Sequence, residues 1–202
     1  MDIVCLDFEG ILVPEIWINV AARTGIDELR LTTRDVPDYD VLMRRRLAIL
    51  KEHGLGLPDI QAAIAQMGPL EGAEAFVAWL RERFLMVLLS DTYYEFAAPF
   101  LRHFCNAILL CHRLAVDECG TIVDYVIRQP DSKRQAVRAF RGLNYRVIAV
   151  GDSYNDVTML AEADAGILFR PPENVVAEFP RFPVTRDYAE LREALTKAGN
   201  AA

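Results

Sequence analysis

Three aspartates lie far apart in the sequence, yet each falls where the end of a buried strand is expected. Asp7 follows the apolar run of residues 1–6, and Asp152 and Asp156 belong to the segment GDSYND at 151–156. At one edge of a sheet, three carboxylates would repel one another unless a cation lay among them. Oxygen ligands that leave room for water and phosphate suit Mg²⁺. The pattern therefore predicts a magnesium site at Asp7, Asp152 and Asp156.

Donors that could hold phosphate oxygens are found close to these carboxylates in the predicted arrangement. The Ser90 hydroxyl, the Lys133 ammonium and the backbone N–H groups around Gly10 and Asp91 are of the required type. Gly10 has no Cβ, so the backbone could approach a ligand closely there. We therefore expect Gly10, Ser90, Asp91 and Lys133 to bind a phosphate group beside the metal ion.

Asp7 and Glu9 are the expected reacting groups. Attack of the Asp7 carboxylate on phosphorus would give an aspartyl-phosphate and divide one difficult step into two easier ones. Glu9 is two residues further along an extended chain and so points to the same side. We expect Glu9 to protonate the leaving alcohol and then to activate water, a role usually worth ~10²–10⁴ in rate.

The elements that must position these residues alternate along the chain. Apolar runs predict buried strands, and stretches with one apolar face predict helices between them. The strands are expected at residues 1–7, 84–89, 146–150 and 165–169, and the helices at 71–83, 131–143, 155–163 and 187–198. Alternation of this kind predicts an α/β, Rossmann-like parallel sheet with helices on both faces, which binds ligands at the carboxyl ends of its strands.

Two segments interrupt the alternation. Residues 14–67 hold several helix signals and no convincing strand, with Gly25 as a helix stop, Asp38 as a cap and Pro58 in a first turn. Residues 107–128 hold two β-rich runs around a turn sequence and predict a hairpin. We therefore expect a core of residues 1–13 and 68–202, with a small helical cap of residues 14–67 inserted after the first strand.

The composition excludes several classes of protein. Hydrophobic residues make up 52% of the 202 residues, which argues against intrinsic disorder, and the formal net charge of −7 argues against nucleic acid as a partner. No window reaches the ~18 consecutive apolar residues of a membrane span. The four cysteines form no CxxC pair, which favours a reducing, cytoplasmic setting.

Four short motifs, in this order, resemble those of the haloacid dehalogenase-like (HAD) superfamily, most of all its phosphoserine phosphatase branch. They are Asp7-Phe8-Glu9, Ser90, Lys133 and Gly151-Asp152-x-x-Asn155-Asp156. The resemblance implies Mg²⁺-dependent phosphoryl transfer through Asp7, under a cap that closes over the substrate. It also implies a metal held by Asp7, the Glu9 carbonyl and Asp152, with Asp156 close behind, and a phosphate-binding role for Asn155.

The substrate is expected to be recognised by the cap. In the family that the chain resembles, a Glu soon after the first motif and an Arg in a cap helix bind the ammonium and carboxylate of phosphoserine. Glu15 and Arg46 are the matching positions. Glu9 stands where the family commonly has Asp, and Asp91 stands where it has Gly. The DFEG form at 7–10 resembles bifunctional members that also pass the phosphoryl group to homoserine.

Other interpretations stay open at this stage. Arg46 belongs to an arginine triplet that could be a solvated helix face, Glu15 could compensate a helix dipole, and Lys133 could be a solvated side chain. The alternatives for the whole chain are a receiver-like module that signals through phospho-aspartate, a metal-free dehalogenase, and a HAD phosphatase for another small phosphomonoester. The sequence does not decide between water and homoserine as acceptor, or whether the chain forms a homo-oligomer.

Overall fold

The computed structural model describes residues 1–32, 35–36 and 38–199 and is built around one sheet. Residues 33, 34 and 37 of the predicted cap and 200–202 of the predicted core lie outside the described residues. The sheet has seven strands in the order β4-β3-β2-β1-β5-β6-β7. All neighbouring strands are parallel except the β3–β4 pair. The predicted Rossmann-like α/β fold is confirmed.

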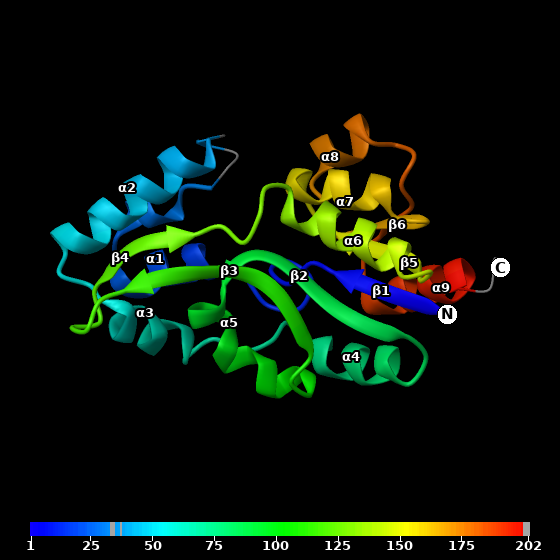
Figure 1. Ribbon diagram of the computed structural model, residues 1–202, viewed down its shortest axis with the longest axis horizontal. Helices are drawn as coiled ribbons and strands as arrows, with labels where there is room; N and C mark the ends of the chain where they lie inside the picture. The colour runs from blue at the N-terminus through cyan, green and yellow to red at the C-terminus, as the bar shows by residue number, and fades with distance from the viewer. Residues whose placement is uncertain (33–34, 37, 200–202) are drawn as a thin grey trace.

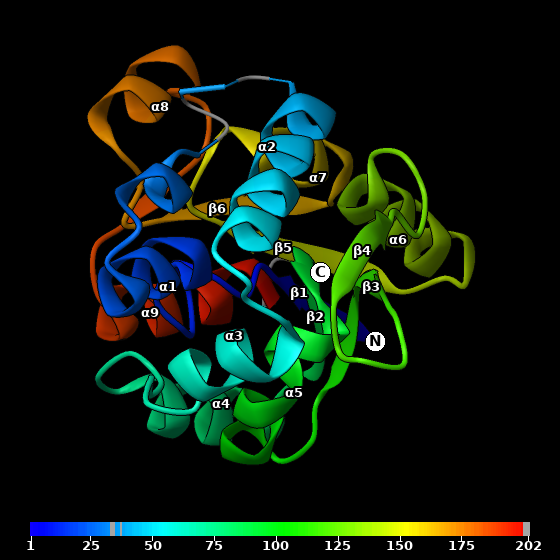
Figure 2. The ribbon, with the colours of Figure 1, turned by 90° about the vertical axis from the view of Figure 1, so that its left-hand side faces the viewer.

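The strands place the carboxyl ends of β1, β2 and β5 side by side. Their bounds are β1 Asp2–Leu6, β2 Leu85–Tyr93, β3 Ile108–Val116, β4 Ile122–Val126, β5 Arg146–Gly151, β6 Ala165–Phe169 and β7 Val184–Thr185. β1 is the central strand and pairs with β2 through Leu6↔Leu88 and with β5 through Leu6↔Val150. Figure 2 looks toward these ends, with α1 and α2 in front of the sheet.

Helices cover both faces of the sheet because successive residues of β1 point to opposite sides. Val4 and Leu6 pack into the larger apolar cluster, with α4, α5 and α9, whereas Ile3 and Cys5 pack against α6, α7 and α8. The helix bounds are α1 Ile16–Thr24, α2 Tyr39–Glu52, α3 Leu57–Ile64, α4 Ala73–Arg81, α5 Tyr94–Leu101, α6 Ser132–Gly142, α7 Val157–Glu162, α8 Glu173–Glu178 and α9 Tyr188–Gly199. No described helix is long and apolar enough to cross a membrane.

The described part of the segment between β1 and α4 contains the helices α1, α2 and α3. As predicted, α1 ends at a left-handed Gly25, Asp38 caps α2 by accepting from the Val41 N–H, and Pro58 lies in the first turn of α3. α1, α2 and α3 share the larger apolar cluster with β1, and α2 also contacts the β3–β4 hairpin through Arg44, whose Nη1 lies 2.8 Å from Asp124 Oδ1. This segment is thus held to the sheet at two places (Figure 1).

β2 and α5 depart from the simplest sequence expectation. The strand was expected to end at residue 89 but continues to Tyr93, because beyond a bulge it pairs again with β3 through Tyr93↔His112. α5 runs through Pro99, which has no N–H for the carbonyl of Glu95 four residues earlier. Gln61 of α3 donates to that carbonyl instead, at 2.9 Å, and so stabilises the helix around the proline.

Candidate active site

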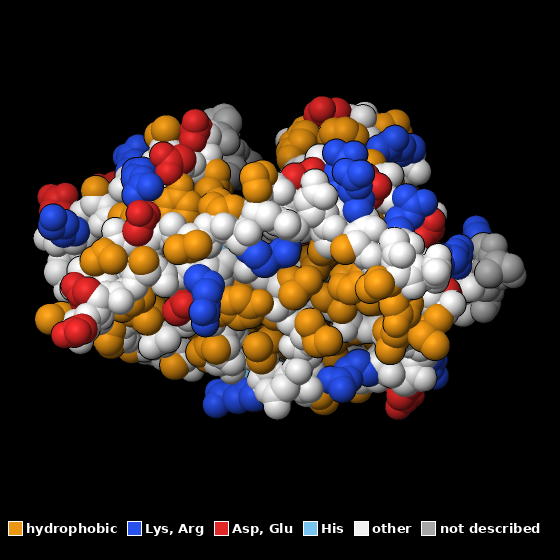
Figure 3. Space-filling model, in the orientation of Figure 1, with side chains coloured by type: hydrophobic (Ala, Val, Ile, Leu, Met, Phe, Trp, Pro, Cys, Tyr) orange, Lys and Arg blue, Asp and Glu red, His pale blue; other side chains and the backbone are white. Residues whose placement is uncertain are grey.

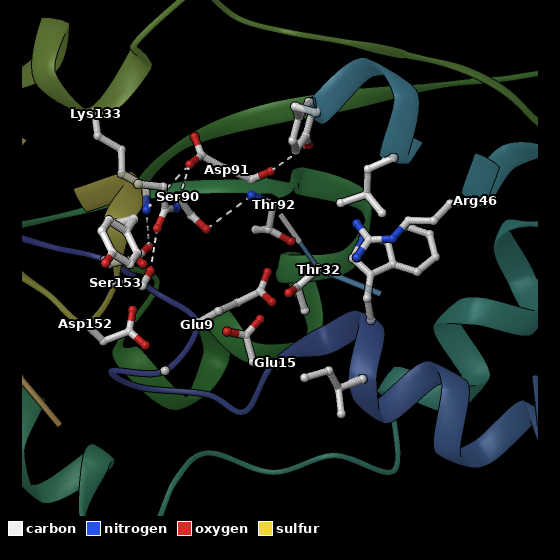
Figure 4. Close-up of a pocket in the computed structure, with 18 residues that line it drawn as sticks. Glu9, Glu15, Thr32, Arg46, Ser90, Asp91, Thr92, Lys133, Asp152 and Ser153 are labelled. Carbon is white, nitrogen blue, oxygen red and sulfur yellow. Dashed lines mark hydrogen bonds and ion pairs between the residues drawn. The ribbon is translucent and has the colours of Figure 1, made fainter. Parts of the chain in front are cut away.

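The predicted site residues gather around one cavity of about 370 Å³ at the carboxyl ends of β1, β2 and β5. Figure 3 shows a notch in the molecular outline between the lobe carrying α2 and the lobe carrying α7 and α8. Among the lining residues are all the predicted ones except Asp156: Asp7, Glu9, Gly10, Glu15, Arg46, Ser90, Asp91, Lys133, Asp152 and Asn155. Figure 4 shows most of these side chains converging from separate elements.

Lys133 joins the buried carboxylates at the inner end of the cavity. Its Nζ lies 2.9 Å from Asp7 Oδ1 and 2.7 Å from Asp156 Oδ1. Its side chain is 3% exposed, so the alternative of a solvated lysine is wrong. Burial alone would lower the pKa of Lys133, but the charges of Asp156, Asp7 and Asp91 outweigh it and hold that pKa well above its usual range. The ammonium is therefore a permanent positive charge.

The GDSYND segment folds tightly around Asp156. Asp156 Oδ2 accepts from the backbone N–H groups of Asp152 (2.9 Å) and Ser153 (3.2 Å), while its Oδ1 binds Lys133. A Cβ on Gly151 would lie 2.3 Å from the Cβ of Asp156, so only glycine fits there. Asp156 is fully buried behind the cavity wall, where it fixes both Lys133 and the loop that presents Asp152.

The donor set fits a magnesium ion. One oxygen each of Asp7, Asp152 and Asp156 lies within 4.8 Å of the others. Burial holds the pKa of Asp7 well above its usual range. The charges of Asp156 and Asp152 raise this pKa further, and the charge of Lys133 lowers it only in part. Burial and Asp156 likewise raise the pKa of Asp152 to about 7. The negative charge of the carboxylates thus exceeds the single positive charge of Lys133. A divalent cation would supply the positive charge that balances it.

Gly10 serves the site differently from the sequence expectation. Its backbone N–H, which was assigned to a phosphate, donates to the carbonyl of Val13 at 2.8 Å. The residue has φ of +75°, and a Cβ added to it would lie 2.5 Å from Asp152 Oδ2. Gly10 therefore turns the chain after β1 and leaves room for the Asp152 carboxylate, which corrects its assignment as a phosphate donor.

Glu9 lies in the same cavity and also caps helix α1. Its Oε2 accepts from the backbone N–H of Ile16 at 2.9 Å, which satisfies one of the free donors at the helix start. Burial raises the pKa of Glu9 to about 7, the charge of Glu15 adds to this, and the hydrogen bond from Ile16 opposes it. A carboxyl group with a pKa near neutrality can both give and take a proton at physiological pH.

Ser90 and Asp91 lie beyond the last β1–β2 pair, on the stretch of β2 that the sequence placed in a loop. Ser90 is buried, and its hydroxyl oxygen accepts from the Thr92 N–H at 3.2 Å, so its own hydrogen is available to a ligand. Asp91 is half-buried and accepts from the Nδ2 of Asn155 at 2.9 Å. Burial works against it, but the charge of Lys133 and the bonds from His112 and Asn155 hold the pKa of Asp91 below its usual range.

Arg46 is the one arginine of its triplet that turns inward. It is 6% exposed, whereas Arg44 and Arg45 are exposed, so the solvated-face alternative is wrong for Arg46. Its guanidinium lies 4.5 Å from the Trp17 ring centroid, and Nη2 donates to the Leu31 carbonyl at 2.7 Å. Its Nε is buried and has no hydrogen-bond partner in the described part of the chain. The guanidinium also lines the cavity, where its positive charge is suited to an anionic ligand.

Glu15 is placed at the mouth of the cavity, immediately before α1. Its side chain makes no cap hydrogen bond to the helix, although its charge at the N-cap still faces the helix dipole. In Figure 4 it lies next to Glu9, between Asp152 and Arg46. Glu15 and Arg46 therefore present opposite charges to one space, as a substrate with both an ammonium and a carboxylate would require.

Further lining residues could not be identified from the sequence. Thr92 follows Asp91 on β2, Thr32 lies in the segment before α2, and Trp17 lies in the first turn of α1. None of them belongs to a motif. Trp17 and Thr32 reach the cavity through the packing of α1 and α2 on the sheet, whereas Thr92 reaches it through the extension of β2.

Comparison with known proteins identifies a family and several similar sequences. Residues 1–164 match the model of the haloacid dehalogenase-like hydrolases. The phosphoserine phosphatase of Pseudomonas syringae pv. tomato is 60% identical over 200 residues, which are 99% of this chain and 84% of that protein. The phosphoserine phosphatase ThrH of Pseudomonas aeruginosa is also 60% identical over 200 residues, 99% of this chain and 98% of that protein.

The fold is shared with solved structures. A substrate-bound phosphoserine phosphatase complex superposes with a TM-score of 0.77 at 21% identity, covering 97% of both chains. A phosphoserine phosphatase in its apo form gives a TM-score of 0.77 at 21% identity, over 96% of this chain and 98% of that one. At this identity the likeness concerns the fold alone.

Proposed function

The chain belongs to the haloacid dehalogenase-like hydrolase family, and from this premise we propose that it is a Mg²⁺-dependent phosphoserine phosphatase. The observation that carries the proposal is that two groups of charged side chains line one cavity. Asp7, Lys133 and Asp152 come from the ends of β1 and β5 and from the start of α6, and Glu15 and Arg46 come from the start of α1 and from α2. The first group suits a phosphate with its metal ion, and the second suits the charged groups of an amino acid. The two relatives that are 60% identical carry the same activity in their names.

In this proposal the residues at the inner end perform the chemistry. Mg²⁺, when bound by the carboxylates of Asp7 and Asp152 and the Glu9 carbonyl, would neutralise phosphate charge and orient the ester. Asp7 attacks phosphorus through the oxygen that Phe8 N–H and Lys133 do not hold, because those two bonds fix its Oδ1. Ser90 and Lys133 donate to the phosphoryl oxygens as negative charge shifts toward the leaving group.

Glu9 is proposed to move the protons. It gives a proton to the seryl oxygen as the ester bond breaks, and it takes one from water as the aspartyl-phosphate is hydrolysed. Its bond from the Ile16 N–H holds one carboxyl oxygen and leaves the other for these transfers. The longer side chain of Glu, compared with the Asp common in the family, is accommodated because its carboxyl group reaches the start of α1.

Residues 14–67 are proposed to form the cap that selects phosphoserine. Arg46 would bind the carboxylate with its guanidinium, and its contact with Trp17 would hold the guanidinium plane in place. Glu15 would bind the ammonium. The free state of all four cysteines supports our placement of the enzyme in the cytoplasm, where thiols stay reduced.

We also propose homoserine as a second acceptor. An aspartyl-phosphate can be attacked by any alcohol that is oriented well and shielded from water. Homoserine carries the same ammonium and carboxylate as serine, with a hydroxyl one carbon further out. Once serine has left, Glu15 and Arg46 could therefore bind homoserine in its place and direct its hydroxyl toward phosphorus.

The test is to incubate the protein with Mg²⁺ and phosphoserine, with and without homoserine, and to follow free phosphate and phosphohomoserine together. Release of phosphate that requires Mg²⁺ supports the phosphatase. Appearance of phosphohomoserine at the expense of phosphate supports the second acceptor. No phosphate release in the presence of Mg²⁺ would contradict the proposed function, and release without phosphohomoserine would contradict the acceptor alone.

A further inference from the structure

Asp91 carries a negative charge next to the place where a phosphate must bind. Its Oδ2 lies 3.7 Å from Lys133 Nζ, and Lys133 already pairs with Asp7 and Asp156. A third carboxylate in this position would weaken phosphate binding if it did nothing else, because it competes for the same ammonium. We therefore expect the carboxylate to have another role at this site.

The groups that surround the Asp91 carboxylate indicate this role. Oδ2 accepts from Asn155 Nδ2 at 2.9 Å, and Oδ1 faces Ser132 Oγ at 3.4 Å and His112 Nε2 at 3.6 Å. The ring of His112 is oriented by its other nitrogen, because Nδ1 accepts from the Arg128 N–H at 3.2 Å. This bond leaves the proton on Nε2, so the buried imidazole presents a donor to Asp91. Every group that faces the carboxylate can donate.

Packing alone does not hold the amide of Asn155. The side chain is exposed and lies between the site cavity and a second, more open cavity of about 550 Å³, both of which it lines. Its Oδ1 accepts from Ser153 Oγ, and its Nδ2 donates one hydrogen to Asp91. Together these two bonds decide which way the amide faces, since a carboxylate can accept and cannot donate. The second hydrogen of Nδ2 is left for a ligand.

We propose that Asp91 is a positioning residue for phosphoryl transfer. Its carboxylate orients the amide of Asn155 and restrains the ammonium of Lys133, and His112 and Ser132 hold the carboxylate from behind. The family commonly has glycine at this place, which could supply none of these contacts. The inference rests on the proposed function only for its kinetic test, because the orientation of Asn155 is a property of the protein without substrate.

The first measurement is an NMR experiment that does not depend on enzymatic activity. In ¹⁵N-labelled protein, the side-chain amide resonances of Asn155 are identified by their loss in Asn155→Ala. We expect Asp91→Ala to shift these resonances toward those of a solvated amide, whereas Glu82→Gln, which removes an exposed charge paired with Arg83, leaves them in place. Unchanged Asn155 resonances in Asp91→Ala would overturn the inference, whatever the protein proves to catalyse.

The second measurement is kinetic and uses phosphoserine beside an aryl phosphate with no amino-acid part. Asp91→Ala is expected to lower kcat about 10-fold to 100-fold on both esters alike, the usual range for hydrogen bonds to charged groups. In the Asn155→Ala background the Asp91→Ala change should lower kcat far less, because the amide that Asp91 orients is then absent. Asp91→Asn should recover part of the loss, since an amide oxygen can accept from Asn155 while its NH₂ faces the donors of His112 and Ser132.

The outcomes separate this inference from the proposed function. Equal losses from Asp91→Ala with and without Asn155 would show that the two residues act independently and would overturn the inference. A loss confined to phosphoserine would assign Asp91 to the amino-acid end of the site and would overturn it too. If the wild-type protein hydrolyses only the aryl ester, the phosphoserine assignment fails, and the aryl ester still decides the role of Asp91.

Discussion

Asp152→Asn is expected to make the metal-free protein more stable. In the folded state burial and the charge of Asp156 raise the pKa of Asp152 to about 7, against 3.8 for an ordinary aspartate. The folded protein therefore holds a proton that the unfolded chain releases, and its stability falls as the pH rises from about 4 to about 7. Fully ionised, this group disfavours folding by about 4 kcal/mol, since each pKa unit is worth about 1.4 kcal/mol.

The expected gain is smaller than that limit. Asp152 is partly exposed, so solvent screens its charge, and the variant loses part of the bond to Ser153. We therefore expect Asp152→Asn to gain about 2 kcal/mol at pH 8 in EDTA, which corresponds to a Tm about 4–8 °C higher for a chain of this length. Mg²⁺ at about 100 times its Kd should stabilise the wild type by about 2.7 kcal/mol and leave the variant unchanged.

Thermal unfolding followed by circular dichroism between pH 5 and pH 8, with EDTA or with Mg²⁺, measures all of these quantities. Asp124→Asn is the matched control, because it removes an exposed aspartate whose ion pair with Arg44 contributes less than about 1 kcal/mol. A variant less stable than the wild type at pH 8 in EDTA would refute the reasoning. A wild type whose stability does not change over this pH range would also refute it, because ionisation of the clustered carboxylates would then not destabilise the fold.

Three further predictions concern single residues of the site. Asp7→Asn should abolish turnover of phosphoserine while the circular dichroism spectrum is retained, and retained turnover would remove Asp7 as the nucleophile. Arg46→Ala should lower kcat/KM for phosphoserine about 100-fold or more but that for an aryl phosphate much less, as expected for loss of a charged contact; an equal loss on both would contradict the clamp. Gly10→Ala should lower Mg²⁺ affinity in calorimetry, because its Cβ would meet the Asp152 carboxylate at 2.5 Å; unchanged affinity would contradict that contact.

The sequence predicted the parts of this structure that depend on local pattern and on the order of the motifs. Buried parallel strands are short apolar runs, so β1, β5 and β6 could be located within a residue or two. The extension of β2 to Tyr93 could not be found this way, because it depends on pairing with His112 of a strand that follows along the chain. The bond from Gly10 to Val13 was missed for a different reason, since a tight turn satisfies a donor that the motif alone leaves available.

The side chains at the cap end show what sequence patterns cannot resolve. Arg44, Arg45 and Arg46 are consecutive and chemically identical, yet only Arg46 is buried, because the face of α2 that it shares with Met43 and Leu47 packs inward. Its partner Trp17 comes from another helix, and their contact at 4.5 Å exists only because α1 and α2 enclose the same cavity. A helical pattern gives the face of each residue, but the packing of two helices decides which cation meets which ring.

The start of the chain joins the chemistry to the cap in a way that bears on how the site would close. Asp7 ends β1, Gly10 turns the chain beside Asp152, and the carboxylate of Glu9 reaches forward to the first N–H of α1. Any displacement of α1 therefore pulls directly on the group proposed to move protons, and Glu15 at the same helix start moves with it. A substrate that draws Glu15 and Arg46 together through its ammonium and carboxylate would fix α1, and with it the Glu9 carboxyl group. In the proposed mechanism, binding of the amino-acid part would thus also position the acid, so a phosphate ester without that part should be turned over more slowly even when its phosphate binds well.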